Sequence, residues 1–219
     1  CGVFCFMKEK KTGTWKIWVV TIFLFAIVVA ATIRVSTLPV LNFTAKGSKV
    51  HIVIDPGHGG FDPGKVGTIG TLEKDVNLNI SLKLREILTK SGYTVAMTRE
   101  KDEALCGETT GKKKVEDLNA RLAVIDKEKP ELTVSIHQNS YSAGTKGAQV
   151  FYYSGSEEGK RLANVLQETI KEEMGDGNHR VEKANDSYYM LKKSSGPFVI
   201  IECGFLSNPE EEKLLISEE

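Results

Sequence analysis

Five short runs of β-branched, aliphatic and aromatic residues recur along the chain after residue 49. They occupy residues 50–54, 93–97, 132–136, 148–153 and 198–203. The first and last of them, VHIVI and FVIIEC, are apolar almost throughout, which is typical of strands that are covered on both faces. The pattern therefore predicts five strands in a sheet with a buried interior.

A different spacing fills the segments between these runs. Apolar residues recur at intervals of three and four over residues 76–88, 118–125 and 162–170, which predicts three amphipathic helices. Gly92 and Gly175 follow the first and third of these segments, where a glycine commonly ends a helix.

The end of the chain carries the signals of a helix start. Asn208 is a favoured N-cap residue, Pro209 suits the first helical position, and acidic residues follow in the first turn. These residues predict a final helix that extends through Leu215. Strands and helices thus alternate, and we predict one α/β domain over residues 50–219, with a mainly parallel twisted sheet flanked by helices.

One apolar segment precedes this alternation. Residues 17–33, IWVVTIFLFAIVVAATI, contain no charge and are bounded by Lys16 and Arg34. A helix of about 17–25 apolar residues spans a bilayer, so this segment is just long enough. A buried core helix is the alternative, but the segment lies between a basic tail and a polar linker. We therefore predict one transmembrane helix.

The charges around this segment predict its orientation. Four lysines precede it, whereas Arg34 alone follows closely. Basic residues stay on the cytoplasmic side, so residues 1–16 are expected to form a cytoplasmic tail, residues 34–49 a linker, and residues 50–219 a domain outside the cytoplasm. The apolar stretch exceeds the usual signal-peptide core of about 7–15 residues. A single-pass membrane anchor is therefore favoured over cleavage and secretion.

The chain has 219 residues and no net charge, but its charge is unevenly distributed. Residues 1–49 contain seven basic residues and one acid, so the exported body carries an excess of negative charge. An acidic body argues against nucleic acid as a partner. The four cysteines contain no CxxC pair and predict neither a disulfide framework nor a cysteine zinc cluster, and no function is expected for Cys1 or Cys5.

Polar residues that can carry chemistry follow three of the predicted strands. Asp55 and His58 come after the first strand, His137 and Asn139 follow the third, and Glu202 lies near the end of the fifth. Sites in sheets of this kind collect beyond the carboxyl ends of the strands. These side chains are therefore expected to gather at one edge of the sheet.

Two histidines and one glutamate match the ligand set of a catalytic zinc site, in which the fourth position is left to water. The proposed ligands are His58, Glu73 at the start of the first helix, and His137. Such a site lowers the pKa of water and polarises a carbonyl, which permits amide hydrolysis at neutral pH. Glu202 is a spare carboxylate that is placed to take and return a proton.

The spacing of these residues also allows a structural interpretation. In it, His58 bonds a turn, Glu73 caps a helix and His137 is satisfied in the core, because no HExxH helix holds the ligands in register. The glycine-rich residues 57–70 lack the Gly-Lys-Ser/Thr ending of a phosphate-binding loop, so nucleotide chemistry is not expected.

Four stretches occur in a characteristic order: HIVIDPGHGG, the Leu-Glu-Lys that begins the first helix, VSIHQNS and IIECGFLSN. Together they resemble the zinc-dependent N-acetylmuramoyl-L-alanine amidases of bacterial cell walls, the type 3 amidases, which have a phosphorylase/hydrolase-like α/β fold. The likeness covers about residues 50–219. It implies one zinc ion on His58, Glu73 and His137, with Glu202 as the catalytic glutamate.

The reaction that this resemblance implies is cleavage of the amide between the lactyl group of N-acetylmuramic acid and the L-alanine of the stem peptide. Asn139 and Asp55 are then candidates for orienting ligands or substrate. Arg180 is a candidate for contact with a peptide carboxylate, with an exposed loop arginine as the alternative. The segment 188–202 after it resembles the family's final strand pair.

Within the family, the chain resembles the compact membrane-anchored branch that Gram-positive spore-formers use on cortex peptidoglycan. It shows no wall-binding repeats and no additional module, so we expect that a partner protein supports its activity or metal retention. Two rival interpretations remain open. One is another extracellular zinc hydrolase, a peptidase or deacetylase, and the other is a non-catalytic peptidoglycan-binding protein with a structural metal. Cys203 is a possible fourth ligand only in the second, and strand alternation points it away from Glu202.

Overall fold

Six strands form the sheet of the computed structural model, which describes residues 50–107, 112–174 and 178–217. Their order across the sheet is β2-β1-β3-β6-β4-β5. The strands are β1 (His51–Pro56), β2 (Thr94–Met97), β3 (Leu132–Asn139), β4 (Gln149–Tyr152), β5 (Lys183–Ala184) and β6 (Phe198–Phe205).

The sheet is mainly parallel, as predicted. β1 pairs in parallel with β2 and β3, and β3 pairs in parallel with β6. β4 runs antiparallel to β6, and the short β5 is parallel to β4. The carboxyl ends of β1, β3 and β6 therefore meet at one edge of the sheet.

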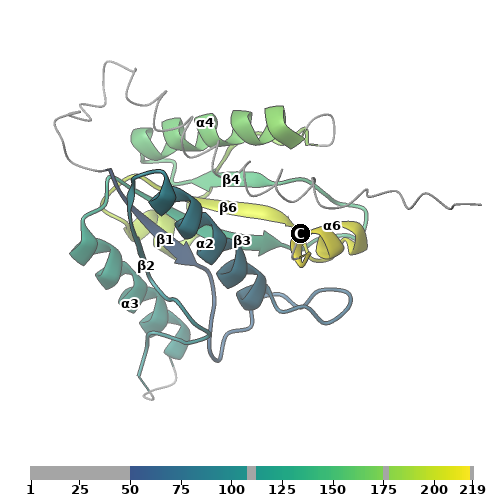
Figure 1. The fold of residues 1–219 in the computed structure, drawn as a ribbon, viewed down its shortest axis with the longest axis horizontal. Coiled ribbons are helices and arrows are strands. Elements are labelled where there is room, and N and C mark those ends of the chain that lie inside the picture. The colour runs from purple at the N-terminus through teal and green to yellow at the C-terminus, as the bar shows by residue number, and fades with distance from the viewer. Residues whose placement is uncertain (1–49, 108–111, 175–177, 218–219) are drawn as a thin grey trace, which may run out of the picture.

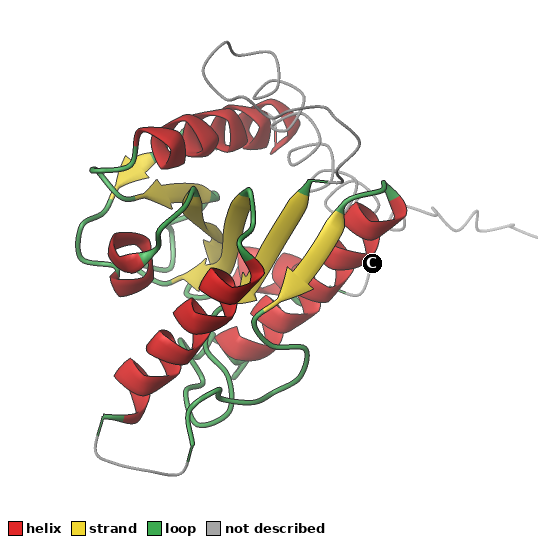
Figure 2. Cartoon of the chain, turned by 90° about the vertical axis from the view of Figure 1, so that its left-hand side faces the viewer, coloured by secondary structure: helices red, strands yellow, loops and turns green. Residues whose placement is uncertain are grey.

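Helices cover both faces of the sheet (Figures 1 and 2). They are α2 (Glu73–Lys90), α3 (Lys113–Glu128), α4 (Glu157–Met174), α5 (Tyr189–Lys193) and α6 (Pro209–Leu215). Apolar residues of α2 and α4 share one core cluster, whereas those of α3 and α5 share another. The two clusters lie on opposite faces of the sheet, because alternate residues of β1 and β6 belong to one or the other.

β6 shows this alternation clearly. Val199 and Ile201 pack in the cluster of α2 and α4, whereas Phe198 and Ile200 pack in the cluster of α3 and α5. Glu202 therefore continues the face that α3 and α5 cover, on the side opposite Cys203. Cys203 packs against the α2 and α4 cluster, as the alternation predicted, and burial raises the pKa of its thiol to about 12.

The predicted strands are all present, but the interpretation of the segment before β6 was wrong. Residues Tyr189–Lys193 form the helix α5 instead of one strand of a final pair. The Asn185 side chain accepts the backbone N–H groups of Ser187 and Tyr188, which turns the chain into this helix. Met190 and Leu191 are then buried against the sheet.

The last helix begins as the sequence predicted. The Asn208 side chain accepts the N–H groups of Glu210 and Glu211, and Pro209 occupies the first turn. The predicted transmembrane helix at residues 17–33, with the tail and linker around it, lies outside the described residues. None of the helices that the structure describes is long and apolar enough to cross a membrane.

A buried ion pair joins α3 to the end of β1. Arg121 donates to the Asp55 carboxylate at 2.9 Å, and both side chains are almost completely buried. Asp55 also accepts the hydroxyls of Thr98 and Ser135, and Arg121 makes a second ion pair with Asp117 at 2.7 Å. Burial alone would raise the pKa of Asp55, but Arg121 and the two hydroxyls bring it below its ordinary value.

Replacing Arg121 by Met should therefore lower the free energy of unfolding by about 3–5 kcal/mol, because the Asp55 charge is left buried without its partner. Chemical denaturation measures this loss. The matched control is Arg85→Met, which breaks the more exposed ion pair with Glu100 and should cost less than about 1 kcal/mol. Similar losses for the two variants would contradict this account of the ion pair.

Candidate metal centre

The turn after β1 presents His58 at the edge of the sheet. The Gly57 N–H donates to the Ile136 carbonyl of β3 at 3.0 Å, which continues the strand pairing for one more residue. His58 then adopts a left-handed conformation with a φ of 62°, which is uncommon for a residue with a side chain. Such conformations persist where the surroundings enforce them, often at functional sites.

Two buried arginines enforce this turn by occupying its carbonyl groups. Arg99, which follows β2, donates to the carbonyls of Pro56 and Gly57, both at 2.9 Å. Arg121 donates to the carbonyls of Pro56 and His58. The backbone on both sides of the His58 ring is therefore fixed by guanidinium groups from β2's end and from α3.

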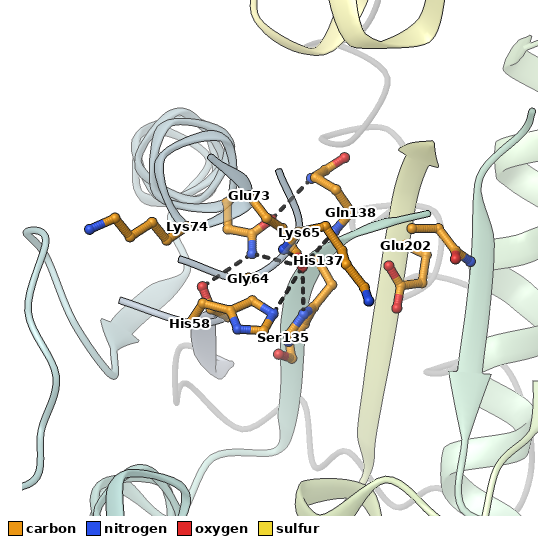
Figure 3. Close-up of polar contacts among 12 residues, drawn as sticks. His58, Gly64, Lys65, Glu73, Lys74, Ser135, His137, Gln138 and Glu202 are labelled. Carbon is orange, nitrogen blue, oxygen red and sulfur yellow. Dashed lines mark hydrogen bonds and ion pairs between the residues drawn. The ribbon is translucent and has the colours of Figure 1, made fainter. Parts of the chain in front are cut away.

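Three side chains converge beyond the strand ends (Figure 3). His58 Nε2 lies 3.1 Å from Glu73 Oε1, and His137 Nδ1 lies 3.0 Å from the same oxygen. One ligand atom from each residue lies within 4.8 Å of the other two. The predicted trio, taken from β1's end, the start of α2 and β3, is thus brought together in space.

Glu73 is held by its backbone and by its side chain. Its N–H donates to the Lys65 carbonyl, and its carboxylate accepts the N–H groups of Lys65 at 2.8 Å and Gln138 at 3.1 Å. Burial would raise the pKa of Glu73, but the hydrogen bonds from His137 and His58 bring it far below its ordinary value. Glu73 is therefore an ionised carboxylate, as a metal ligand must be.

His58 is oriented by a residue that sequence reasoning missed. Its Nδ1 lies 2.9 Å from a carboxylate oxygen of Asp62, which leaves Nε2 directed at Glu73. A carboxylate behind a metal-binding histidine fixes the orientation of the ring in this way. Asp62 lies in the loop before α2, and only its position four residues after His58 could have indicated the contact.

Glu202 lies on the neighbouring strand beside this trio (Figure 3). It is the register partner of His137 in the parallel pair of β3 and β6, so both side chains lie on the same face. Glu202 is buried, and its Oε2 has no hydrogen-bond partner among the described residues. Burial raises the pKa of this carboxyl, against the opposing effect of His137.

The residues present fit a zinc ion. Two imidazole nitrogens and one carboxylate oxygen form an open set of three ligands, which is characteristic of catalytic zinc sites, whereas structural sites have four. The trio is the one group of potential metal ligands in the described part of the chain. The Gly57 backbone also lies so close to His137 that a Cβ there would be 2.2 Å from the ring.

The three weaker candidates occupy different places. Asp55 does not reach the trio directly. It accepts a hydrogen bond from Arg121, which in turn donates to the His58 carbonyl. The Asn139 side chain accepts the N–H of Ser140 at the end of β3. Arg180 donates to the Lys146 carbonyl at 2.9 Å and to Gln149 Oε1 at 3.2 Å.

The family described as N-acetylmuramoyl-L-alanine amidase matches residues 52–219. The chain belongs to this amidase family. The resemblance predicted from the four ordered motifs is thus confirmed, and with it the expectation of an enzyme of this class.

Individual amidases with similar sequences and structures support the match. The germination-specific N-acetylmuramoyl-L-alanine amidase of Bacillus subtilis is 38% identical over 168 residues, which cover 75% of this chain and 70% of that protein. The CwlD amidase of Clostridioides difficile, solved in complex with the GerS lipoprotein, is 42% identical with a TM-score of 0.74. That match covers 78% of this chain and 89% of the solved chain. The AmiC2 amidase of Nostoc punctiforme is 32% identical with a TM-score of 0.66, over 78% of this chain and 88% of that one.

Replacing Gly57 by Ala should lower the affinity of this candidate site for zinc at least about tenfold, because the new methyl group would displace the His137 ring. Titration with a competing zinc chelator measures the affinity. Gly196→Ala is the matched control, because a Cβ at Gly196 would meet no atom within 4 Å. Unchanged zinc affinity in Gly57→Ala would refute the assignment of His137 as a ligand.

Replacing Glu202 by Gln should stabilise the metal-free amidase by about 1 kcal/mol at pH 7–8, because a buried charge is removed. The folded-state pKa of Glu202 lies above its unfolded value, so folding favours the protonated form. Wild-type stability relative to the Gln variant therefore falls as the pH rises through that pKa, and the difference shrinks toward pH 4. Urea unfolding across this pH range tests the trend, with Glu173→Gln as an exposed control on α4. A pH-independent difference would contradict the proposed burial of charge.

Proposed function

We propose that this chain hydrolyses the amide bond between the lactyl group of N-acetylmuramic acid and the L-alanine that begins the stem peptide of peptidoglycan. The observation that carries the proposal is the trio of His58, Glu73 and His137 with the free carboxylate oxygen of Glu202 beside it. Membership of the amidase family supports the choice of bond.

A zinc ion held by His58 Nε2, Glu73 and His137 Nδ1 is part of this proposal. When bound, zinc supplies Lewis acidity toward the amide carbonyl and lowers the pKa of water. The chain prepares for this chemistry by keeping Glu73 ionised and by fixing the His58 ring through Asp62. The ligand atoms are thus set in place before any substrate arrives.

Glu202 performs the proton transfer in this proposal. Its free Oε2 accepts a proton from the attacking water as the C–O bond forms, and then passes that proton to the leaving L-alanine nitrogen as the C–N bond breaks. A raised pKa suits both halves of this task, because the carboxylate is a stronger base and then holds the proton until it is transferred to the nitrogen.

Arg180 is proposed to meet a carboxylate of the stem peptide. Its guanidinium donates to Gln149 Oε1 at 3.2 Å and lies 4.6 Å above the Phe205 ring. Gln149 is the register partner of Glu202 in the antiparallel pair of β4 and β6. The Arg180 guanidinium is therefore fixed on the side of Glu202 away from His137. We place the stem peptide on this side, where it would extend away from the scissile bond.

We further propose that spore cortex is the substrate and that the protein is anchored in the membrane with its catalytic domain outside. The similarity to the germination-specific amidase of Bacillus subtilis supports the first point, and the apolar residues 17–33 support the second. A lipoprotein that supports activity is proposed as a partner, because the similar CwlD amidase was solved in complex with the GerS lipoprotein.

Digestion of purified peptidoglycan by the zinc-loaded chain tests the proposed function. Mass spectrometry should find stem peptides with a free L-alanine amino terminus and intact glycan, whereas Glu202→Gln should lower the rate at least about 100-fold. Cleavage within the peptide, or loss of acetate from the glycan, would instead identify a peptidase or a deacetylase. Full activity on intact peptidoglycan without added protein would eliminate the need for a partner.

A further inference from the structure

The two carboxylate oxygens of Glu202 have different surroundings. Oε2 is buried without a hydrogen-bond partner in the described part of the chain. Oε1 lies 3.5 Å from the hydroxyl of Tyr188, which is the one hydrogen bond recorded for this carboxylate among the described residues. The length is at the upper limit for a hydrogen bond, and such contacts at catalytic groups commonly tighten when substrate binds.

Tyr188 is held in place by contacts outside the metal centre. Asn185 accepts its backbone N–H at 3.0 Å, and the residue directly precedes the first residue of α5. Its ring packs edge-to-face against Phe151 of β4, with 5.5 Å between the ring centroids. The phenol is therefore directed at β6 by a turn, by the docking of α5 and by an aromatic contact.

The position of this ring follows from the face on which α5 packs. Phe151 and Ile200 belong to the cluster of α3 and α5, and Glu202 continues the same face of β6. Tyr188 thus approaches Glu202 on the face of the sheet that α5 covers, which is also the face on which His137 lies. Burial, together with the Glu202 charge, raises the pKa of Tyr188 to about 12, so its hydroxyl is a donor at neutral pH.

We propose that Tyr188 is a positioning residue for Glu202: its hydroxyl donates to Oε1 and so leaves Oε2 as the oxygen that accepts and returns the proton. This inference rests on the amidase function proposed above. Without the hydroxyl, the carboxylate can rotate about its terminal bond, and neither oxygen is held toward the reacting water. The expected consequence is slower proton transfer with no change in how zinc or substrate binds.

Tyr188→Phe in the zinc-loaded full chain tests the proposal, because it removes the hydroxyl and keeps the ring against Phe151. We expect kcat on peptidoglycan fragments to fall about tenfold, with KM, zinc affinity and Tm unchanged. Tyr189→Phe is the matched control, since the Tyr189 hydroxyl donates to Asn119 at 2.8 Å on the exposed side of α5. A raised KM with unchanged kcat would show that Tyr188 binds substrate instead, and equal effects of the two variants would assign it a merely structural role.

A second measurement does not depend on activity. In protein labelled with ¹³C at the tyrosine Cζ, the Tyr188 resonance should shift in Glu202→Gln, whereas that of Tyr189 should not. Assignment comes from the two Phe variants. An unmoved Tyr188 resonance would overturn the positioning role even if the amidase is active. Absence of amidase activity in the wild type would instead refute the proposed function. The Tyr188 resonance would then still test whether its hydroxyl contacts Glu202.

Discussion

Two buried guanidinium groups hold the turn that carries His58 into the candidate metal centre. Arg99 and Arg121 together occupy the carbonyls of three consecutive residues, from Pro56 to His58. Without the arginines, the carbonyls of Pro56 and His58 would lose their hydrogen-bond donors, at a cost of about 1–3 kcal/mol for each, whereas the Gly57 carbonyl would keep its bond from Asn77. Arg121 can in turn be buried because Asp55 and Asp117 neutralise its charge. The left-handed conformation of His58 depends on this arrangement.

The parallel strand pairing places His137 and Glu202 close to this turn. The carboxyl ends of β1, β3 and β6 meet at one edge, which brings His137 and Glu202 beside His58 although the three lie far apart in the sequence. Glu73 enters from the start of α2, where the loop that precedes this helix fixes its backbone and its carboxylate. Strands thus supply Glu202 and His137, whereas His58 comes from the turn after β1 and Glu73 from the first residue of α2.

The parts of the structure that sequence reasoning predicted are those with a local signal. Strand runs, helix spacing and the Asn208 cap leave such signals, and polar residues at strand ends indicated the trio and Glu202. Sequence analysis did not identify Asp62, Arg99, Arg121 and Tyr188, because their contacts depend on how loops and helices pack in the folded chain. The helix α5 was predicted as a strand, because Tyr188 and Tyr189 at its start have high β propensity. The Asn185 turn that precedes them overrides this propensity.

The alternation along β6 has a consequence for how the protein folds. A slip of this strand by one residue would exchange its two faces, placing Cys203 beside the histidines and driving the Glu202 carboxylate into the apolar layer beneath α2 and α4. The same strand pairing that buries Ile201 therefore also places Glu202, and not Cys203, beside the histidines. A mispaired chain would bury the Glu202 charge in an apolar layer and remove its carboxylate from the candidate metal centre, so one strand register determines both the packing of β6 and the composition of that centre.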